Sequence, residues 1–330
     1  MKFYKKVTAV LVSAAVALSL GGCTTRENNV KSSGPTEITK DGDSSQPVPN
    51  PSGSDSALTG VPNVTSDNEY ILAAFDKVQN TISYQGVLKN SVEMTIGDST
   101  SKTNVETNTT MHSDTMTLKV DRTIEADGVK TQSAMYILPG EDGVYVYAEG
   151  EDGWSKQKLD ENGLFFVVLS YDYCGFASVI LSKIDQCTEG EKETLDGKNV
   201  IRIDGVLPAG SLPTVASYTR AFDLVGLSDL PETYYEGVED TPISVWIDEE
   251  TGYLVKYSID YAKALTKASA NLIKETSPES EENAPSFAVY SAEVILSNFE
   301  QAPMVNLPAE AENAKLYEPP TEEENSSAQE

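Results

Sequence analysis

Residues 116–147 have the sequence MTLKVDRTIEADGVKTQSAMYILPGEDGVYVY, in which apolar and polar side chains alternate and Asp-Gly pairs interrupt the alternation. A period of two is typical of a β-strand with one buried face, and Asp-Gly between two such runs favours a tight hairpin turn. The stretch therefore predicts three consecutive antiparallel strands at 116–120, 133–138 and 144–147. Polar partners on the second face predict a sheet that is wet on one side and covered on the other.

The flanking sequence extends this sheet and supplies its cover. Upstream, alternation at 92–96 and a Thr-rich run at 103–110 predict more strands, and Ile71, Ala74, Phe75 and Val78 recur at the spacing of a helix that Ser66 or Asp67 can cap. Downstream, we expect one or two apolar helices in 164–184, helices at 212–225 and 261–274, and strands at 199–206, 243–248, 253–257 and 287–299. This order predicts an α+β fold in which a single, strongly curved antiparallel sheet wraps helices on its concave side.

The first 22 residues have the features of a secretory signal peptide. Three lysines precede an uncharged run at 7–20, which is shorter than the roughly 20 residues that span a bilayer. The run ends in Leu20-Gly21-Gly22-Cys23, which resembles the lipobox of bacterial lipoproteins, and this resemblance implies cleavage before Cys23 and a lipid on its thiol. We therefore expect a signal peptide at 1–22 and an extracytoplasmic protein that is lipid-anchored to the cell membrane.

Composition divides the remainder of the chain. Residues 23–66 are rich in Ser, Gly, Pro and Asp and predict a disordered tether, the acidic residues 319–330 predict a disordered tail, and 67–318 predict one folded domain. The net charge of −28 becomes −31 once the three lysines of the signal peptide are removed. A polyanion of this size repels phosphate backbones, which argues against nucleic acid as a partner.

The residues that usually carry chemistry are sparse. His112 is the single histidine, and the sequence has neither Cys-x-x-Cys nor His-x-x-x-His spacing nor a phosphate-binding Gly-rich loop, so we expect no metal, no cofactor and no enzymatic activity. With Cys23 lipidated, Cys174 and Cys187 remain. An oxidising compartment would let them form a disulfide, and the alternative is two buried free thiols.

Several of these features together resemble the LolA-like superfamily of exported carriers, and particularly its LppX–LprG-like lipoproteins in Gram-positive bacteria. The resemblance rests on the opening helix and Met/Thr-rich meander, the strand at 143–147 followed by Trp154, the hairpin WIDEETGYLVK at 246–256, and a last strand ending in Asn298-Phe299. It implies a half-barrel whose apolar interior binds a lipid or acyl chain. The residues expected to face that interior are Tyr145, Tyr147, Trp154, Phe165, Phe166, Phe176, Ile180 and Trp246.

Other interpretations remain open at this stage. For each of the apolar residues expected in the cavity, the alternative is simple packing in the core between sheet and helices. The runner-up function is a non-enzymatic structural or protein-interaction module of the cell envelope without a small-molecule ligand. A third interpretation, glycan binding, would use an exposed aromatic pair such as Tyr234 and Tyr235.

Overall fold

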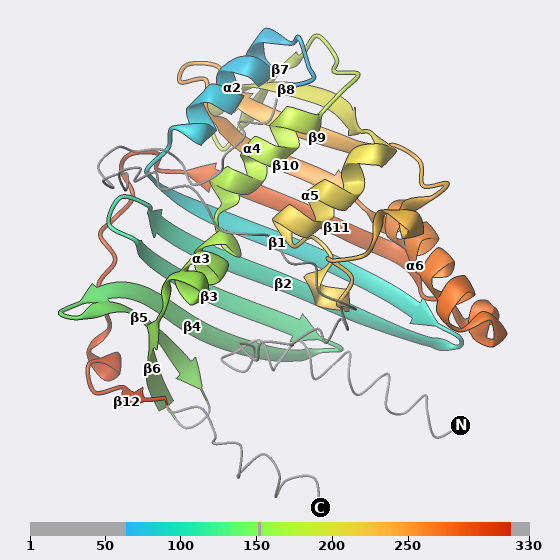
Figure 1. Cartoon of the computed structure of the whole chain (residues 1–330). Coiled ribbons are helices and arrows are strands. Elements are labelled where there is room, and N and C mark those ends of the chain that lie inside the picture. The colour runs from blue at the N-terminus through green and yellow to red at the C-terminus, as the bar shows by residue number, and fades with distance from the viewer. Residues whose placement is uncertain (1–63, 151–152, 318–330) are drawn as a thin grey trace, which may run out of the picture.

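The computed structural model describes residues 64–150 and 153–317 and shows one twelve-stranded sheet, unclosed and curved, with helices packed against one face (Figure 1). The strands are β1 (Ser83–Ile96), β2 (Ser99–His112), β3 (Thr117–Ala126), β4 (Val129–Gly140), β5 (Gly143–Gly150), β6 (Gly153–Leu159), β7 (Glu191–Leu195), β8 (Lys198–Leu207), β9 (Thr241–Asp248), β10 (Leu254–Asp260), β11 (Ser286–Ser297) and β12 (Lys315–Leu316). The expected α+β architecture with a single curved sheet is confirmed. The signal peptide, Cys23, most of the tether and the acidic tail lie outside the described residues.

The strands follow the order β12-β6-β5-β4-β3-β2-β1-β11-β10-β9-β8-β7. Neighbours pair antiparallel throughout, except that β12 pairs parallel with β6. The meander β1–β6 is joined by short turns, and the predicted Asp127-Gly128 turn has both residues at positive φ, 49° and 83°. Two left-handed residues in sequence give the twist that a two-residue hairpin requires.

The face toward the helices, here called the concave face, is apolar because the strands alternate. In β3, Leu118 and Val120 are buried on this face, while Lys119 and Asp121 form an ion pair on the convex face. The same alternation places Ile137 of β4 and Val146 of β5 on the concave face. The core therefore lies between one side of the sheet and the helices.

The helices are α2 (Glu69–Gln79), α3 (Glu161–Leu169), α4 (Tyr173–Lys183), α5 (Leu212–Thr219) and α6 (Ala262–Thr276). In Figure 1, α2, α4 and α5 lie across β1 and β8–β11, α3 lies over β3–β6, and α6 packs near one end of β11. Helix α4 is the most deeply buried of these, and it packs against both α2 and α5. The apolar run at 164–184 thus forms two helices, one of the two options that we expected.

Two local expectations are wrong. Asn68, and not Ser66 or Asp67, caps α2, since its side chain accepts hydrogen bonds from the backbone N–H groups of Tyr70 and Ile71. The helix expected at 212–225 ends at Thr219, because Arg220 adopts a left-handed conformation with φ of 54°. The folded contacts also begin slightly earlier than expected, with the backbone N–H of Thr65 donating to the carbonyl oxygen of Ser182.

Residues 298–317, here called the C-terminal strap, leave β11 and run to β12 at the far edge of the sheet (Figure 1). The strap begins with Asn298 and Glu300 at positive φ, and the carbonyl oxygen of Pro303 lies 3.0 Å from Nε2 of His112. Between the strap and the convex face of β1–β4 lies an open, mainly polar groove of about 290 Å³. His112 is thus in contact with the strap.

Candidate functional site: the concave face and helix α3

The eight residues expected to line a cavity fall into three groups. Phe176 and Ile180, both on α4, are buried at 2% and 1% exposure and face the sheet. They border an enclosed space of only about 30 Å³, which also touches Leu88 and Tyr257. Pockets for small-molecule ligands measure roughly 300–1,000 Å³. In this conformation the space between α4, α5 and the sheet is therefore filled by side chains.

The second group lies on the convex face, and for these residues the expectation is wrong. Strand pairing places Tyr147 opposite Lys156 and Tyr145 opposite Lys158, on the face that Val146 does not occupy. Trp154 is on the same face as Lys156, two residues away, with its ring centroid 5.7 Å from that of Tyr136. Side chains alternate along a strand, so the valines of β5, and not its tyrosines, face the helices.

Trp246 is also on the convex face, for the same reason. Its neighbours Val245 and Ile247 are both buried. The indole ring lies beneath Lys256 Nζ at 4.8 Å, and the indole N–H donates to Glu193 at 2.9 Å. Such polar partners are typical of an aromatic side chain at a wet surface.

The third group, Phe165 and Phe166, belongs to α3 and is 47% and 67% exposed. The whole helix, ENGLFFVVL, is apolar around its circumference after the first turn, yet Gly163 is its only buried residue. A helix that is apolar on all sides is normally buried. Its N-terminus is fixed by Asp160, whose side chain accepts a hydrogen bond of 2.7 Å from the Gly163 N–H.

The link between α3 and α4 hydrogen-bonds to the end of α3 and also fixes α4 to the sheet. The carboxylate of Asp172 caps α4 by accepting from the Gly175 N–H at 2.9 Å, and it accepts from the Tyr84 hydroxyl of β1 at 3.2 Å. Burial raises the pKa of Asp172.

Among the described helices none alone has the length and apolar composition of a membrane span; α3 and α4 pass that test only together, with a bend of 63° between them.

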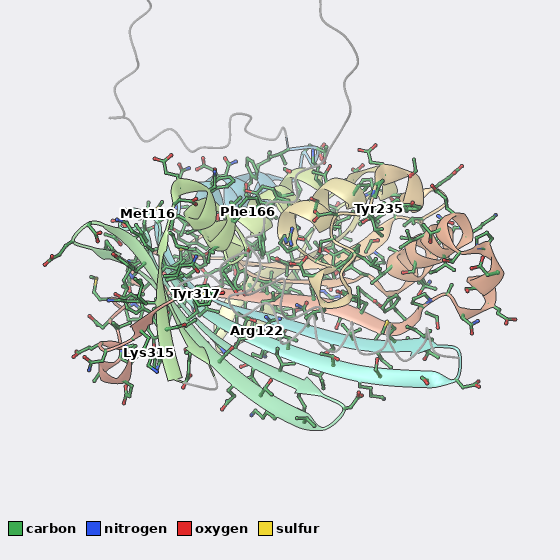
Figure 2. The ribbon with its side chains drawn as sticks, turned by 60° about the horizontal axis from the view of Figure 1, so that its bottom comes forward. Met116, Arg122, Phe166, Tyr235, Lys315 and Tyr317 are labelled. Atoms are coloured by element: carbon green, nitrogen blue, oxygen red, sulfur yellow. The ribbon has the colours of Figure 1, made fainter. Side chains whose placement is uncertain are left out.

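One charged side chain interrupts the concave face of the meander. Strand pairing places Arg122 of β3 between Thr107 of β2 and Ser133 of β4, on the face of Val120. The buried Nε of Arg122 has no hydrogen-bond partner within the described residues. Figure 2 shows Arg122 on the sheet and Phe166 in the helix layer above it. Arg122 was not among the site residues predicted from the sequence.

Two tyrosines of the helix layer lie within electrostatic reach of this arginine. Burial raises the pKa of Tyr171 and of Tyr173, and the positive charge of Arg122 lowers both in part, which places all three groups in one electrostatic environment. The Tyr173 ring lies 5.6 Å from Phe176, and Phe176 lies 6.4 Å from Tyr218. The hydroxyl of Tyr218 is a second buried polar group without a partner, and burial raises its pKa to about 12.

The remaining predictions concern the two cysteines, the tyrosine pair and a metal site. Cys174 and Cys187 are free thiols, and the expected disulfide is absent. Cys174 lies in the first turn of α4 and Cys187 beyond its C-terminus, so a helix of about 16 Å separates them, whereas a disulfide requires Cα atoms within roughly 7 Å. Tyr235 is buried, which removes it as an exposed glycan platform. No three His, Cys, Asp or Glu side chains of the described residues are placed to hold a metal ion.

Comparison with known proteins adds the following. Residues 69–165, which include α2 and β1–β6, match a family of unknown function (DUF6612). No curated protein matches the chain. Among solved structures, the chain is similar to LprF from Mycobacterium bovis, with 10% identity, a TM-score of 0.42 and coverage of 74% of this chain and 96% of LprF.

Two further similar structures belong to the kinds of protein that the sequence resembles. The lipoprotein LppX from Mycobacterium tuberculosis is 15% identical, with a TM-score of 0.35 and coverage of 74% of this chain and 100% of LppX. A putative outer membrane lipoprotein-sorting protein domain from Vibrio parahaemolyticus is 9% identical, with a TM-score of 0.18 and coverage of 69% and 89%. Likenesses of this size say nothing about a ligand.

Proposed function

We propose that this protein is a lipoprotein of the cell envelope, anchored through Cys23 at the extracytoplasmic face of the membrane, that binds a hydrophobic ligand between α3 and the concave face of the sheet. The ligand is a lipid or an acyl chain, and the role is non-enzymatic. The observation that supports this proposal best is the exposure of α3. Helix α3 is apolar and lies over the sheet, and its two phenylalanines are about half exposed. An exposed apolar surface of this kind is typical of a binding site for an apolar partner.

The exposed area of α3 is large enough to contribute to binding. A phenylalanine presents roughly 200 Å², so about 200 Å² remains exposed on Phe165 and Phe166 together. Covering that area with a ligand would contribute about 5 kcal/mol at 25 cal/mol per Å². Side chains scattered singly on a surface need no such explanation, but these two are adjacent, with ring centroids 6.5 Å apart.

The way in which α3 is attached also supports a helix that covers the ligand site and can move. Helix α4 is fixed to the sheet through the Asp172–Tyr84 hydrogen bond, while α3 precedes the bend at 170–172. We infer that α3 moves relative to α4 when a ligand enters, because the space of about 30 Å³ beside Phe176 is too small for an acyl chain. The buried faces of Phe176 and Ile180 would then become part of the ligand site.

Uptake of a fluorescent fatty acid tests the proposal directly. The purified full chain, freed of detergent, is titrated with cis-parinaric acid, and native mass spectrometry identifies any lipid that copurifies. We expect saturable binding by the wild type and a loss of at least tenfold in affinity for the double variant Phe165→Ser/Phe166→Ser. The matched control is Tyr145→Ser/Tyr147→Ser, which removes two aromatic rings from the convex face. Equal losses in the two double variants, or no uptake by the wild type, would contradict the proposal.

The anchor has its own test. Because the mature chain would carry a charge of −31, an anionic membrane surface repels it, and the lipid on Cys23 must supply the attachment. A Cys23→Ala variant should therefore remain unprocessed or appear in the soluble fraction. If the variant were correctly cleaved and still bound tightly to membranes, the folded domain itself would hold the membrane.

The second candidate function is an interaction module of the envelope, and the filled interior favours it. If the space beside Phe176 never opens, the exposed face of α3 serves as a docking surface for another envelope protein. A photo-crosslinking residue at position 166 discriminates between the two. Crosslinks to a protein partner together with no fatty-acid uptake would establish the module, and crosslinks to lipid would support the carrier.

A further inference from the structure

We infer that the ligand carries an anionic group, a carboxylate or a phosphate, and that Arg122 binds this group beneath the helix layer. The inference rests on the proposed function and adds the chemical class of the ligand. Arg122 is the only charged residue at the concave-face positions of β1–β6, as strand pairing assigns them. A cation at one inward position, where every other inward position of the six strands is uncharged, points to a specific partner.

Within the described residues, the structure provides no such partner. Nε of Arg122 is buried and makes no hydrogen bond, and the side chain takes part in no ion pair. Buried polar groups in folded proteins are nearly always paired, and an isolated buried charge is costly. The Nε atom of this half-buried side chain is therefore a donor for which the described residues supply no acceptor.

Two carboxylates on the helix side of the sheet already have partners. Asp223, whose charge acts on Tyr171, accepts a hydrogen bond from Arg220 at 2.9 Å. Asp172 is occupied by the Tyr84 hydroxyl and the Gly175 N–H. Neither carboxylate lies within ion-pair distance of Arg122, and each already accepts a hydrogen bond from another group.

The surroundings of Arg122 select an anion attached to an apolar chain. Tyr171 and Tyr173 share its environment and supply phenol groups, and the ring of Phe176 continues from Tyr173 toward the unpartnered hydroxyl of Tyr218. Phenol and guanidinium groups donate to an anion, while the aromatic wall and α3 cover an alkyl chain. A free inorganic anion would contact only the phenol and guanidinium groups.

The test compares two probes with the same polyene chain, the ionised cis-parinaric acid and its neutral methyl ester, on the full chain. We expect the wild type to bind the acid at least about tenfold more tightly than the ester, the difference that one charge-assisted hydrogen bond supplies. Arg122→Gln should lose this preference for the acid while keeping its affinity for the ester, and Arg122→Lys should retain part of it. Lys119→Gln is the control: Lys119 is three residues away in β3 and lies on the convex face, paired with Asp121.

The outcomes separate the two proposals. If the wild type binds acid and ester equally, or if Arg122→Gln weakens both equally, the role of Arg122 is wrong and the hydrophobic-ligand proposal stands. If the wild type binds neither probe, both proposals fall. A third arm adds inorganic phosphate: displacement of the acid by low millimolar phosphate would assign Arg122 to a free anion and overturn the lipid-like ligand.

Discussion

Replacing Arg122 by methionine should make the ligand-free protein more stable. Methionine keeps an apolar stem at this concave-face position and removes the unpartnered Nε. An unsatisfied buried donor costs roughly 1–3 kcal/mol. Because the Arg122 side chain is only half-buried, we expect the lower end, a gain of about 1 kcal/mol. For a domain of this size that gain raises Tm by about 2–4 °C.

The assay is differential scanning calorimetry of delipidated wild type, Arg122→Met and a control, Lys119→Met. The control removes an exposed ion pair with Asp121, worth at most about 1 kcal/mol, so its Tm should be unchanged or slightly lower. A fall of 4 °C or more in Arg122→Met would refute the reasoning, because it would mean that the guanidinium makes stabilising contacts in the free protein.

Three further predictions concern the packing around α4. Gly86→Ala should destabilise the fold by about 1–3 kcal/mol in urea unfolding, because the new Cβ would lie 2.6 Å from a ring carbon of Tyr173; a neutral result would mean that the ring shifts freely. Burial raises the pKa of Asp172, so the folded state holds the carboxyl proton more tightly than the unfolded state does. The protonated carboxyl therefore contributes fully to folding stability below the ordinary pKa of 3.8, and this contribution is lost as pH rises through the raised pKa. Wild-type Tm should therefore fall relative to that of Asp172→Asn across this window, and parallel pH profiles would count against it. Cys174 is 3% exposed and burial raises its pKa, so iodoacetamide should label it only after unfolding, when Cys174 and Cys187 should both react without a reductant; an unreactive denatured chain would reveal a disulfide.

The meander was predictable because its physics is local. Alternation at 116–120 and the Asp127-Gly128 turn each act over a few residues. The structure reproduces the turn and the alternation from Leu118 onward, whereas Met116 lies before β3 with a positive φ of 53°. The residues that face inward were also predictable from the alternation, but we had chosen the largest aromatic side chains instead. In β5 the alternation assigns Val144 and Val146 to the concave face, which leaves Tyr145 and Tyr147 outside.

The same alternation contained the signal for Arg122. Leu118, Val120, Arg122 and Ile124 occupy successive positions of one face, so a charge stands where an apolar side chain is expected. The C-terminal strap could not be predicted in this way. Ala311 is fully buried there, yet the strap has no apolar period, since contacts with strands more than 150 residues away determine its path.

Helix α3 and Arg122 depart from the ordinary rules in opposite directions and in the same region. Helix α3 leaves apolar side chains exposed, and β3 directs a cation toward the helix layer without a counterion. Either departure alone could be tolerated as a small loss of stability. Together they describe the complement of an amphiphile, with an apolar chain against the helix and an anion at the strand. Sequences usually satisfy local rules throughout a fold and violate them where a ligand completes the structure. A ligand that satisfied only one of the two would leave the other departure without a physical reason.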